Sequence, residues 1–217
     1  MDAKESSNSS NGNAKSLPSE ASEHRLIVAS TNVGKVREVR LALDDMKNWI
    51  IEPLPAGIPG VDETGTTFIE NATLKATHYS RFVQELALAD DSGLCVNALE
   101  NRPGVYYARY GANSEAQIHR VLTELAEVGA TRAADRSAVF HLAFVVARSG
   151  SVIWSTEAQL QGQISSGPAG EAGFGFDPIF FVPELRKTLA QLTTEEKNRI
   201  SARGQALVEL RRFLLSR

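Results

Sequence analysis

The sequence predicts an α/β fold in which a mixed sheet is flanked by helices. Short apolar runs alternate with segments of helical periodicity, and one run is apolar on both faces, as expected of a central strand. The chain has 217 residues, of which 42% are hydrophobic. That is enough for one sizeable core and rather few for two full domains. We expect one domain over residues 24–217, preceded by a disordered tail over residues 1–23, which are rich in Ser and Asn.

The first half of the domain predicts a strand, a helix, a loop and a second helix. Leu26–Ala29 is an apolar strand, and apolar residues recur at helical spacing from Lys35 to about Lys47. Pro53–Gly60 is rich in proline and glycine and is expected to form a loop. Thr67 and Glu70 then form a capping box that begins a helix. We expect its core face to consist of Phe68, Ala72, Ala76, Tyr79 and Phe82.

A strand is predicted next at Leu86–Asp90, with a tight turn at Ser92-Gly93. After an irregular aromatic stretch, Ser114 and Gln117 predict a capping box and a third helix. Val139–Ala147 is the run that is apolar on both faces. The third helix is expected to bury Ile118, Val121, Leu125 and Val128.

The last third of the chain completes the sheet and adds a helix. Val152–Leu160 is expected to form a hairpin with the central strand. Gly162–Pro178 is glycine-rich and too long for a simple turn, and loops of this size in compact domains are usually functional. Thr193 and Glu196 predict the start of the last helix, which Gly204 interrupts with a kink or a close contact.

Charge and cysteine content narrow the classes of function. The formal net charge is −3, so no global basic field draws the chain to nucleic acid or to an anionic membrane. No apolar run is long enough to span a bilayer, and the first residues lack the features of a signal or transit peptide. Cys95 is the only cysteine, which fits a reducing compartment. We therefore expect a cytoplasmic protein in which Cys95 packs as a small hydrophobe.

A loop of small residues with a lysine follows the first strand. Asn32 or Thr31 could cap the helix behind it and leave backbone N–H groups free for an anion, to which Lys35 would add a positive charge. The chain lacks a Walker A sequence, and this segment taken alone favours an ordinary capped helix with an exposed lysine. The candidate phosphate-binding residues are Ser30, Thr31, Asn32, Val33, Gly34 and Lys35.

Two adjacent aspartates, Asp90 and Asp91, stand at the predicted carboxyl end of the next strand. This is the edge at which open α/β sheets bind their ligands. Because side chains alternate along a strand, the two carboxylates should point to opposite sides. One would face the site, where carboxylates suit Mg²⁺, and the other its supporting groups. Nearby acids or cations that could assist them are Glu63, Glu70 and Lys75.

The glycine-rich segment Gly173–Pro178 combines flat aromatic rings with one carboxylate. Aromatic rings stack on bases, although a packed turn is an equally simple interpretation. Lys197 and Arg203 lie on the last predicted helix, where such cations are usually solvated. Phosphate, metal and base-binding features thus occur together in one chain.

In this order, the segments resemble the Ham1-like inosine triphosphate pyrophosphatase family, from about Arg25 to the C-terminus. Members hydrolyse non-standard purine nucleoside triphosphates such as ITP, dITP and XTP to the monophosphate and pyrophosphate, which cleanses the nucleotide pool. The resemblance implies an elongated, curved mixed sheet with two lobes and a central cleft, a homodimer, and Mg²⁺ as cofactor. Its most specific blocks are Thr31–Lys35, Glu63–Ala72, Ala89–Gly93, Pro103–Tyr110, Gly173–Phe181, and Glu196-Lys197 with Ser201–Leu207.

The resemblance also implies roles for individual residues. Asn32 and Lys35 would hold the triphosphate. Asp91 would bind the metal and activate water, with Glu63 as a further ligand. The substrate would be contacted by Ser92, Phe174, Gly175, Phe176, Asp177, Lys197 and Arg203, of which Phe174 stacks on the base and the last three read its edge and the ribose.

Three positions depart from the family pattern. Ala202 stands where His is usual, Thr31 where Gly is common, and Tyr107 where a small residue is common. We expect an active enzyme that discriminates less between purines, because one imidazole is missing from the base pocket. Two other functions stay open: a related pyrophosphatase acting on modified pyrimidine nucleotides, and a nucleotide-binding module without catalysis.

Overall fold

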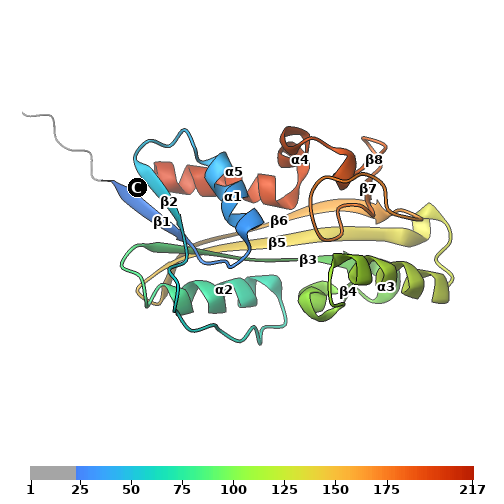
Figure 1. The fold of residues 1–217 in the computed structure, drawn as a ribbon, viewed down its shortest axis with the longest axis horizontal. Coiled ribbons are helices and arrows are strands. Elements are labelled where there is room, and N and C mark those ends of the chain that lie inside the picture. The colour runs from blue at the N-terminus through green and yellow to red at the C-terminus, as the bar shows by residue number, and fades with distance from the viewer. Residues whose placement is uncertain (1–22) are drawn as a thin grey trace, which may run out of the picture.

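The computed structural model describes residues 23–217, so nearly all of the tail expected at 1–23 lies outside the described residues. Figure 1 shows an elongated molecule in which the longest strands run along the sheet. The strands are β1 (His24–Val28), β2 (Trp49–Pro53), β3 (Leu86–Val96), β4 (Arg102–Pro103), β5 (Ser137–Arg148), β6 (Ser151–Ile164), β7 (Phe180–Val182) and β8 (Lys187–Thr188). The α-helices are α1 (Val33–Ala42), α2 (Phe68–Tyr79), α3 (Ser114–Glu127), α4 (Thr194–Ile200) and α5 (Ala202–Leu215).

The eight strands form one sheet in the order β2-β1-β3-β5-β6-β7-β8, with β4 paired to β3. β1 lies parallel to β2 and β3, whereas the remaining pairs are antiparallel. The sheet is therefore mixed, and the predicted α/β class is confirmed. In Figure 1, α1 and α5 lie on one side of the long strands and α2 and α3 on the other. The division into two lobes stays a prediction.

Strand β3 is longer than predicted. We expected a strand that ends at Asp90 and a turn at Ser92-Gly93, and this was wrong, because β3 pairs with β5 from Ala87 to Val96. Its parallel neighbour β1 reaches only Leu88 along it. The two aspartates therefore lie inside β3, just beyond the end of β1. Gly93 is needed for packing, because a Cβ there would lie 2.6 Å from the carbonyl oxygen of Gly104.

Other differences concern the ends and faces of elements. Strand β2 was not predicted from the sequence. Helix α3 begins with the side chain of Asn113, which accepts from Ala116 N at 2.9 Å, so the expected capping box at Ser114 and Gln117 was wrong. Phe82 and Val128 were expected to be buried, but both are exposed because they lie beyond the ends of their helices. The capping box of α2 and the β5–β6 hairpin are confirmed.

The expected C-terminal helix is divided at Ser201 into α4 and α5. Thr193 and Glu196 cap α4 as predicted, and the Ser201 hydroxyl accepts from Gly204 N at 3.0 Å to begin α5. Gly204 makes a close contact, because a Cβ there would overlap the main chain of Asn198. The absence of a side chain at Gly204 thus lets α4 fold back against the first turn of α5.

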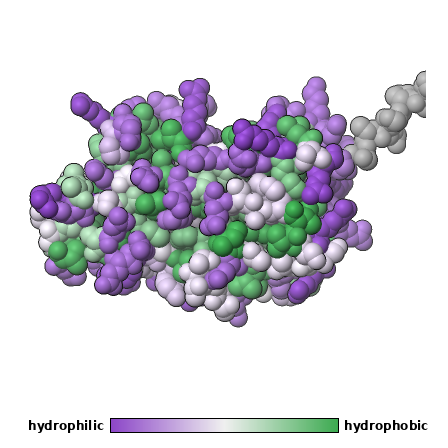
Figure 2. All heavy atoms as spheres, turned by 180° about the vertical axis from the view of Figure 1, so that it is seen from behind, coloured by the Kyte–Doolittle hydropathy of each residue, from purple (hydrophilic) through white to green (hydrophobic). Residues whose placement is uncertain are grey.

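Three apolar clusters hold the layers on the sheet. One joins α1 and α5 to β1, β3 and β5, the second packs beneath α2, and the third surrounds α3 and β7. Cys95 is buried in the second of these, as expected. On the face shown in Figure 2, hydrophobic residues occur in several separate groups among hydrophilic ones. Within residues 23–217, no helix combines the length and hydropathy needed to cross a membrane.

Candidate active site

The two adjacent aspartates point to opposite faces of β3, as their alternation predicts. Asp90 lies on the side of α1 and α5, where its carboxylate is 2.8 Å from Lys35 Nζ and 2.9 Å from Arg203 Nη2. Asp91 lies on the side of α2, where Lys75 Nζ is 3.1 Å away. The Asn71 amide also donates to Asp91 at 3.3 Å. Asp90 is therefore paired with two cations and Asp91 with one.

Their different surroundings separate the pKa values of the two carboxyls. Burial acts to raise the pKa of Asp90, but the adjacent Lys35 and Arg203 outweigh it and hold this pKa well below its usual range. Burial raises the pKa of Asp91, and Lys75 offsets that rise only in part. Asp90 is thus a permanent anion that organises cations. Asp91 is the more basic carboxylate and the better candidate for accepting a proton.

In the predicted phosphate loop, Asn32 is the residue that caps α1, and Lys35 is buried. Asn32 Oδ1 accepts from Gly34 N at 2.9 Å and from Lys35 N at 3.3 Å. These two N–H groups are therefore satisfied within the loop. The Lys35 side chain is buried against Asp90, so the alternative of an exposed lysine was wrong. Ser30 and Thr31 lie in the turn from β1 into α1, and Val33 is the first residue of α1.

Glu63 and Asp91 are brought together by Lys75. Its ammonium lies 3.2 Å from Glu63 Oε2 and 3.1 Å from Asp91 Oδ1. Burial acts to lower the pKa of Lys75, but Asp91, Asp90 and Glu63 outweigh it and raise this pKa. Glu70, by contrast, uses one carboxylate oxygen to cap the preceding loop at Thr66 and Thr67. The acid partner of Asp91 is therefore Glu63.

The donor set around Asp91 fits a divalent cation of the Mg²⁺ type. Within residues 23–217, no group of three or more His, Cys, Asp or Glu side chains is arranged as a metal site. Mg²⁺ does not require one, since it is often held by one or two carboxylates together with substrate phosphates and water. Asp91 and Glu63 supply two carboxylates that already face one cationic centre, the ammonium of Lys75.

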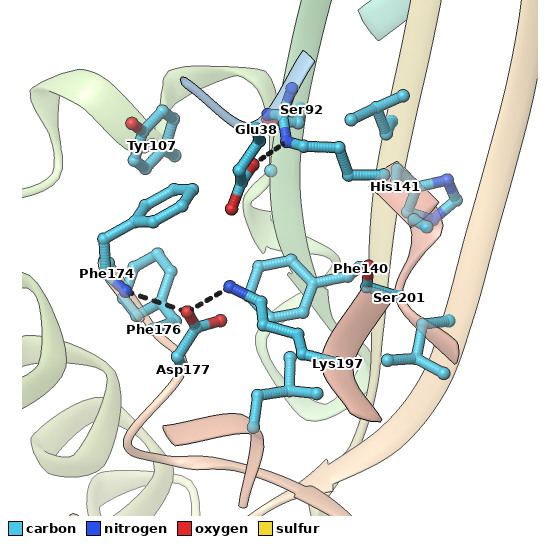
Figure 3. Close-up of a pocket in the computed structure, with 17 residues that line it drawn as sticks. Glu38, Ser92, Tyr107, Phe140, His141, Phe174, Phe176, Asp177, Lys197 and Ser201 are labelled. Carbon is cyan, nitrogen blue, oxygen red and sulfur yellow. Dashed lines mark hydrogen bonds and ion pairs between the residues drawn. The ribbon is translucent and has the colours of Figure 1, made fainter. Parts of the chain in front are cut away.

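The aromatic segment after β6 forms a pocket with α4 and α5 (Figure 3). Asp177 Oδ2 accepts from Phe174 N at 2.8 Å and from Lys197 Nζ at 2.6 Å. The Lys197 ammonium also lies 4.7 Å from the centre of the Phe174 ring. Gly173 has φ +80°, and a Cβ there would overlap Asp177 Oδ2. This turn holds Phe174 and Lys197 together and leaves Phe174 41% exposed.

The predicted base-binding residues share this pocket. Phe176 is buried below Phe174, and Ser92, Gly175, Asp177, Lys197 and Arg203 all contribute to its walls. Asp177 is itself buried and engaged with Phe174 and Lys197, so it fixes the positions of those two residues. Ala202 also lines the pocket, at the position where the family usually has His.

Sequence reasoning missed Glu38 and Asn71 as site residues, and it named Lys75 only among the groups that could assist the aspartates. Arg203 lies between Asp90 and Glu38, with Nε 2.9 Å from Glu38 Oε2. Glu38 stands three residues after Lys35, on the same face of α1, and that spacing was an available signal. Asn71 gives no comparable signal, because only the fold brings it to Asp91.

Comparison with known proteins identifies the family. The model of the Ham1 family matches residues 26–213. This chain is a member of the Ham1 family. Among solved structures, the Coxiella burnetii HAM1 protein superposes with a TM-score of 0.80 and 36% identity, covering 89% of this chain and 100% of that one. The Staphylococcus aureus Ham1 protein gives a TM-score of 0.77 at 36% identity, covering 88% and 98% of the respective chains.

Curated Ham1 relatives carry the name dITP/XTP pyrophosphatase. The protein of that name from Gloeobacter violaceus is 46% identical over 185 residues, which cover 85% of this chain and 91% of the relative. The one from Treponema denticola is 43% identical over 197 residues, covering 88% and 98%. The motifs in the sequence therefore indicated the correct family.

Proposed function

We propose that this Ham1 protein hydrolyses non-standard purine nucleoside triphosphates, such as dITP, ITP and XTP, to the monophosphate and pyrophosphate. Such a reaction removes these nucleotides before they enter DNA or RNA. The observation that carries the proposal is the pair Asp90-Asp91 on opposite faces of β3. Asp90 pairs with Lys35 and Arg203, of which Arg203 lines the aromatic pocket. Asp91 pairs with Lys75 on the other face, where the Glu63 carboxylate is also suited to a metal. The names of the relatives support the same reaction.

In this proposal Asp91 orients a water molecule and takes its proton as the oxygen attacks the α-phosphorus. Asn71 and Lys75 fix the Asp91 carboxylate for that task. Asp91 and Glu63 would hold Mg²⁺, which when bound would neutralise charge on the phosphates and make water more acidic. Lys35, near the N-terminus of α1, stabilises the charge of the departing pyrophosphate.

Base selection is proposed to come from donors in the aromatic pocket. Phe174 stacks on the base, while Lys197 and Arg203 offer N–H groups to a purine that carries a keto oxygen. Adenine carries an amino group in place of the keto oxygen. It would leave the N–H donors of the pocket unpaired, which lowers the affinity for adenine nucleotides. The small Ala202 removes one possible donor, so we expect the preference for ITP over GTP to be weaker than in relatives that carry His.

The decisive experiment measures pyrophosphate release with Mg²⁺ from ITP, XTP, GTP and dTTP, using wild type and Asp91→Asn. We expect release from ITP and XTP, and a loss of about 10³-fold in kcat for the variant, the scale of a general base. Glu157→Gln is a matched control, because Glu157 is an exposed acid on the neighbouring strand β6. Ala143 on β5 lies between the two acids in the sheet, since it pairs with Asp91 on one side and with Glu157 on the other.

Each other outcome contradicts a stated part of the proposal. Preferred release from dTTP would indicate the pyrimidine pyrophosphatase, and nucleotide binding without release would indicate a binding module. Full activity of Asp91→Asn would remove this residue from the chemistry. An ITP to GTP preference as large as that of His-bearing relatives would contradict the role given to Ala202.

We further propose that the protein is a cytoplasmic homodimer. The family resemblance supports the dimer, and the single buried Cys95 fits a reducing compartment. Exposed apolar side chains such as Leu41 and Val208 are available for burial by a second copy. Sedimentation of the purified protein as a monomer at micromolar concentration would contradict the dimer.

A further inference from the structure

Tyr107 lies in the wall of the aromatic pocket without an assigned role. It belongs to a 3-10 helix, Gly104–Arg109, that packs beside β3. Its main chain is fixed, since its carbonyl oxygen accepts from Gln117 Nε2 at 2.9 Å and from Tyr110 N at 3.1 Å. The ring is therefore held at the pocket by its backbone.

The Tyr107 ring extends an aromatic wall. In Figure 3, Tyr107, Phe174 and Phe176 gather on one side of the pocket, opposite Lys197 and Ser201. The Tyr107 and Phe176 rings meet edge to face, with centroids 6.4 Å apart. Phe176 is buried, whereas Phe174 is exposed and Tyr107 is partly exposed. Two of the three rings can therefore touch a ligand.

The Tyr107 hydroxyl does not serve as a structural link. Among the described residues it has no hydrogen-bond partner, whereas the nearby Tyr110 hydroxyl donates to Glu124. Burial raises the pKa of Tyr107, and the charges of Asp90 and Asp91 raise it further, so the phenol stays protonated at neutral pH. Tyr107 thus lines the pocket with Phe174 and Phe176, and no described residue engages its hydroxyl.

We propose that Tyr107 is a substrate-binding residue whose ring packs against the nucleoside of the substrate, next to the part that Phe174 holds. The inference rests on the proposed function, because it takes the ligand of the pocket to be a purine nucleotide. The flat ring adds apolar contact area on the wall that faces Lys197. It thereby strengthens nucleotide binding in a pocket where Ala202 offers only a methyl group.

The test compares Tyr107→Ala, Tyr107→Leu and Tyr107→Phe with wild type in pyrophosphate release from ITP. Loss of one aromatic contact should raise KM about fivefold to tenfold in the Ala and Leu variants, with kcat within about twofold of wild type. Tyr107→Phe keeps the ring and should keep KM. Tyr106→Ala is the matched control, because this neighbouring tyrosine is 59% exposed and does not line the pocket.

Binding of inosine monophosphate, measured by calorimetry, separates this inference from the proposed function. If wild type releases no pyrophosphate but Tyr107→Ala binds the monophosphate more weakly, the proposed reaction fails and the contact stands. The inference is overturned if folded Tyr107→Ala and Tyr107→Leu keep the wild-type KM and monophosphate affinity. It is also overturned if Tyr106→Ala weakens binding as much, or if kcat falls while KM is unchanged.

Discussion

Lys75 is the residue on which the acid side of the site depends. Its ammonium contacts both Asp91 and Glu63, and the Asp91 side chain is only 10% exposed. Two carboxylates in one small site repel each other unless a cation lies close to both. In this structure Lys75 fills that need, because its ammonium lies within 3.2 Å of both acids.

Replacing Lys75 by Met should therefore destabilise the protein by about 3 kcal/mol, because a largely buried carboxylate loses its counter-charge. Urea unfolding measures the change. Lys187→Met is the control, since Lys187 lies 3.7 Å from Glu196 with both side chains over 40% exposed. That exposed pair should contribute less than about 0.5 kcal/mol. Equal unfolding midpoints for the two variants would contradict the structural role of Lys75.

At the scale of elements, the break between α4 and α5 places two site residues. Lys197 comes from α4 and Arg203 from the first turn of α5, and both reach the aromatic pocket. A continuous helix would carry these side chains away from each other, because they are six residues apart and helical neighbours are three or four apart. The break is possible because Ser201 caps α5 and because Gly204 has no side chain to meet the main chain of Asn198.

Gly204→Ala tests this arrangement. Alanine normally stabilises a helix interior by about 1 kcal/mol relative to glycine. Here its Cβ would overlap the main chain of Asn198, so we expect destabilisation of about 2–3 kcal/mol instead. The KM for ITP should rise as Lys197 moves. Gly60→Ala, with no atom within 4 Å of the added Cβ, should stay within about 0.5 kcal/mol of wild type. Stabilisation by Gly204→Ala would contradict the contact.

At the scale of the whole molecule, the long strands carry separate apolar clusters toward their two ends, and polar links supplement these clusters. One such link lies at the cluster around α3. Glu124 accepts from Tyr110, from Arg102 at 2.6 Å and from Arg120 at 2.8 Å. Burial and Glu124 raise the pKa of Tyr110 to about 12. The protonated phenol therefore contributes to the stability of the folded chain.

This link predicts how stability depends on alkaline pH. A tyrosine has a pKa of about 10 when unfolded, below that of folded Tyr110, so its contribution is complete below pH 10 and is lost as pH rises toward 12. The free energy of unfolding of wild type should thus exceed that of Tyr110→Phe by about 1 kcal/mol at pH 8, which is the contribution of one hydrogen bond. The difference should shrink at pH 11. Unfolding curves at both pH values measure it, and a constant difference would contradict the assignment.

The sequence by itself determined features that depend on neighbours along the chain. Strand and helix periods, the caps at Asn32, Thr67 and Thr193, and the opposite directions of Asp90 and Asp91 are all local. The ordered motifs were specific enough to indicate the Ham1 family, which the comparison confirms. Local patterns predict well because capping hydrogen bonds and side-chain alternation act within a few residues.

Only the tertiary structure decided where the elements stop and which charges meet. Strand β3 runs on to Val96 because its partner β5 continues beside it, and no signal within β3 reports the length of β5. Arg203 reaches Asp90 across 113 positions of the chain, and Lys75 lies between Glu63 and Asp91 only because α2 packs on that face. Buried ion pairs form between whichever side chains the packing of the sheet brings together, so their partners follow from the fold.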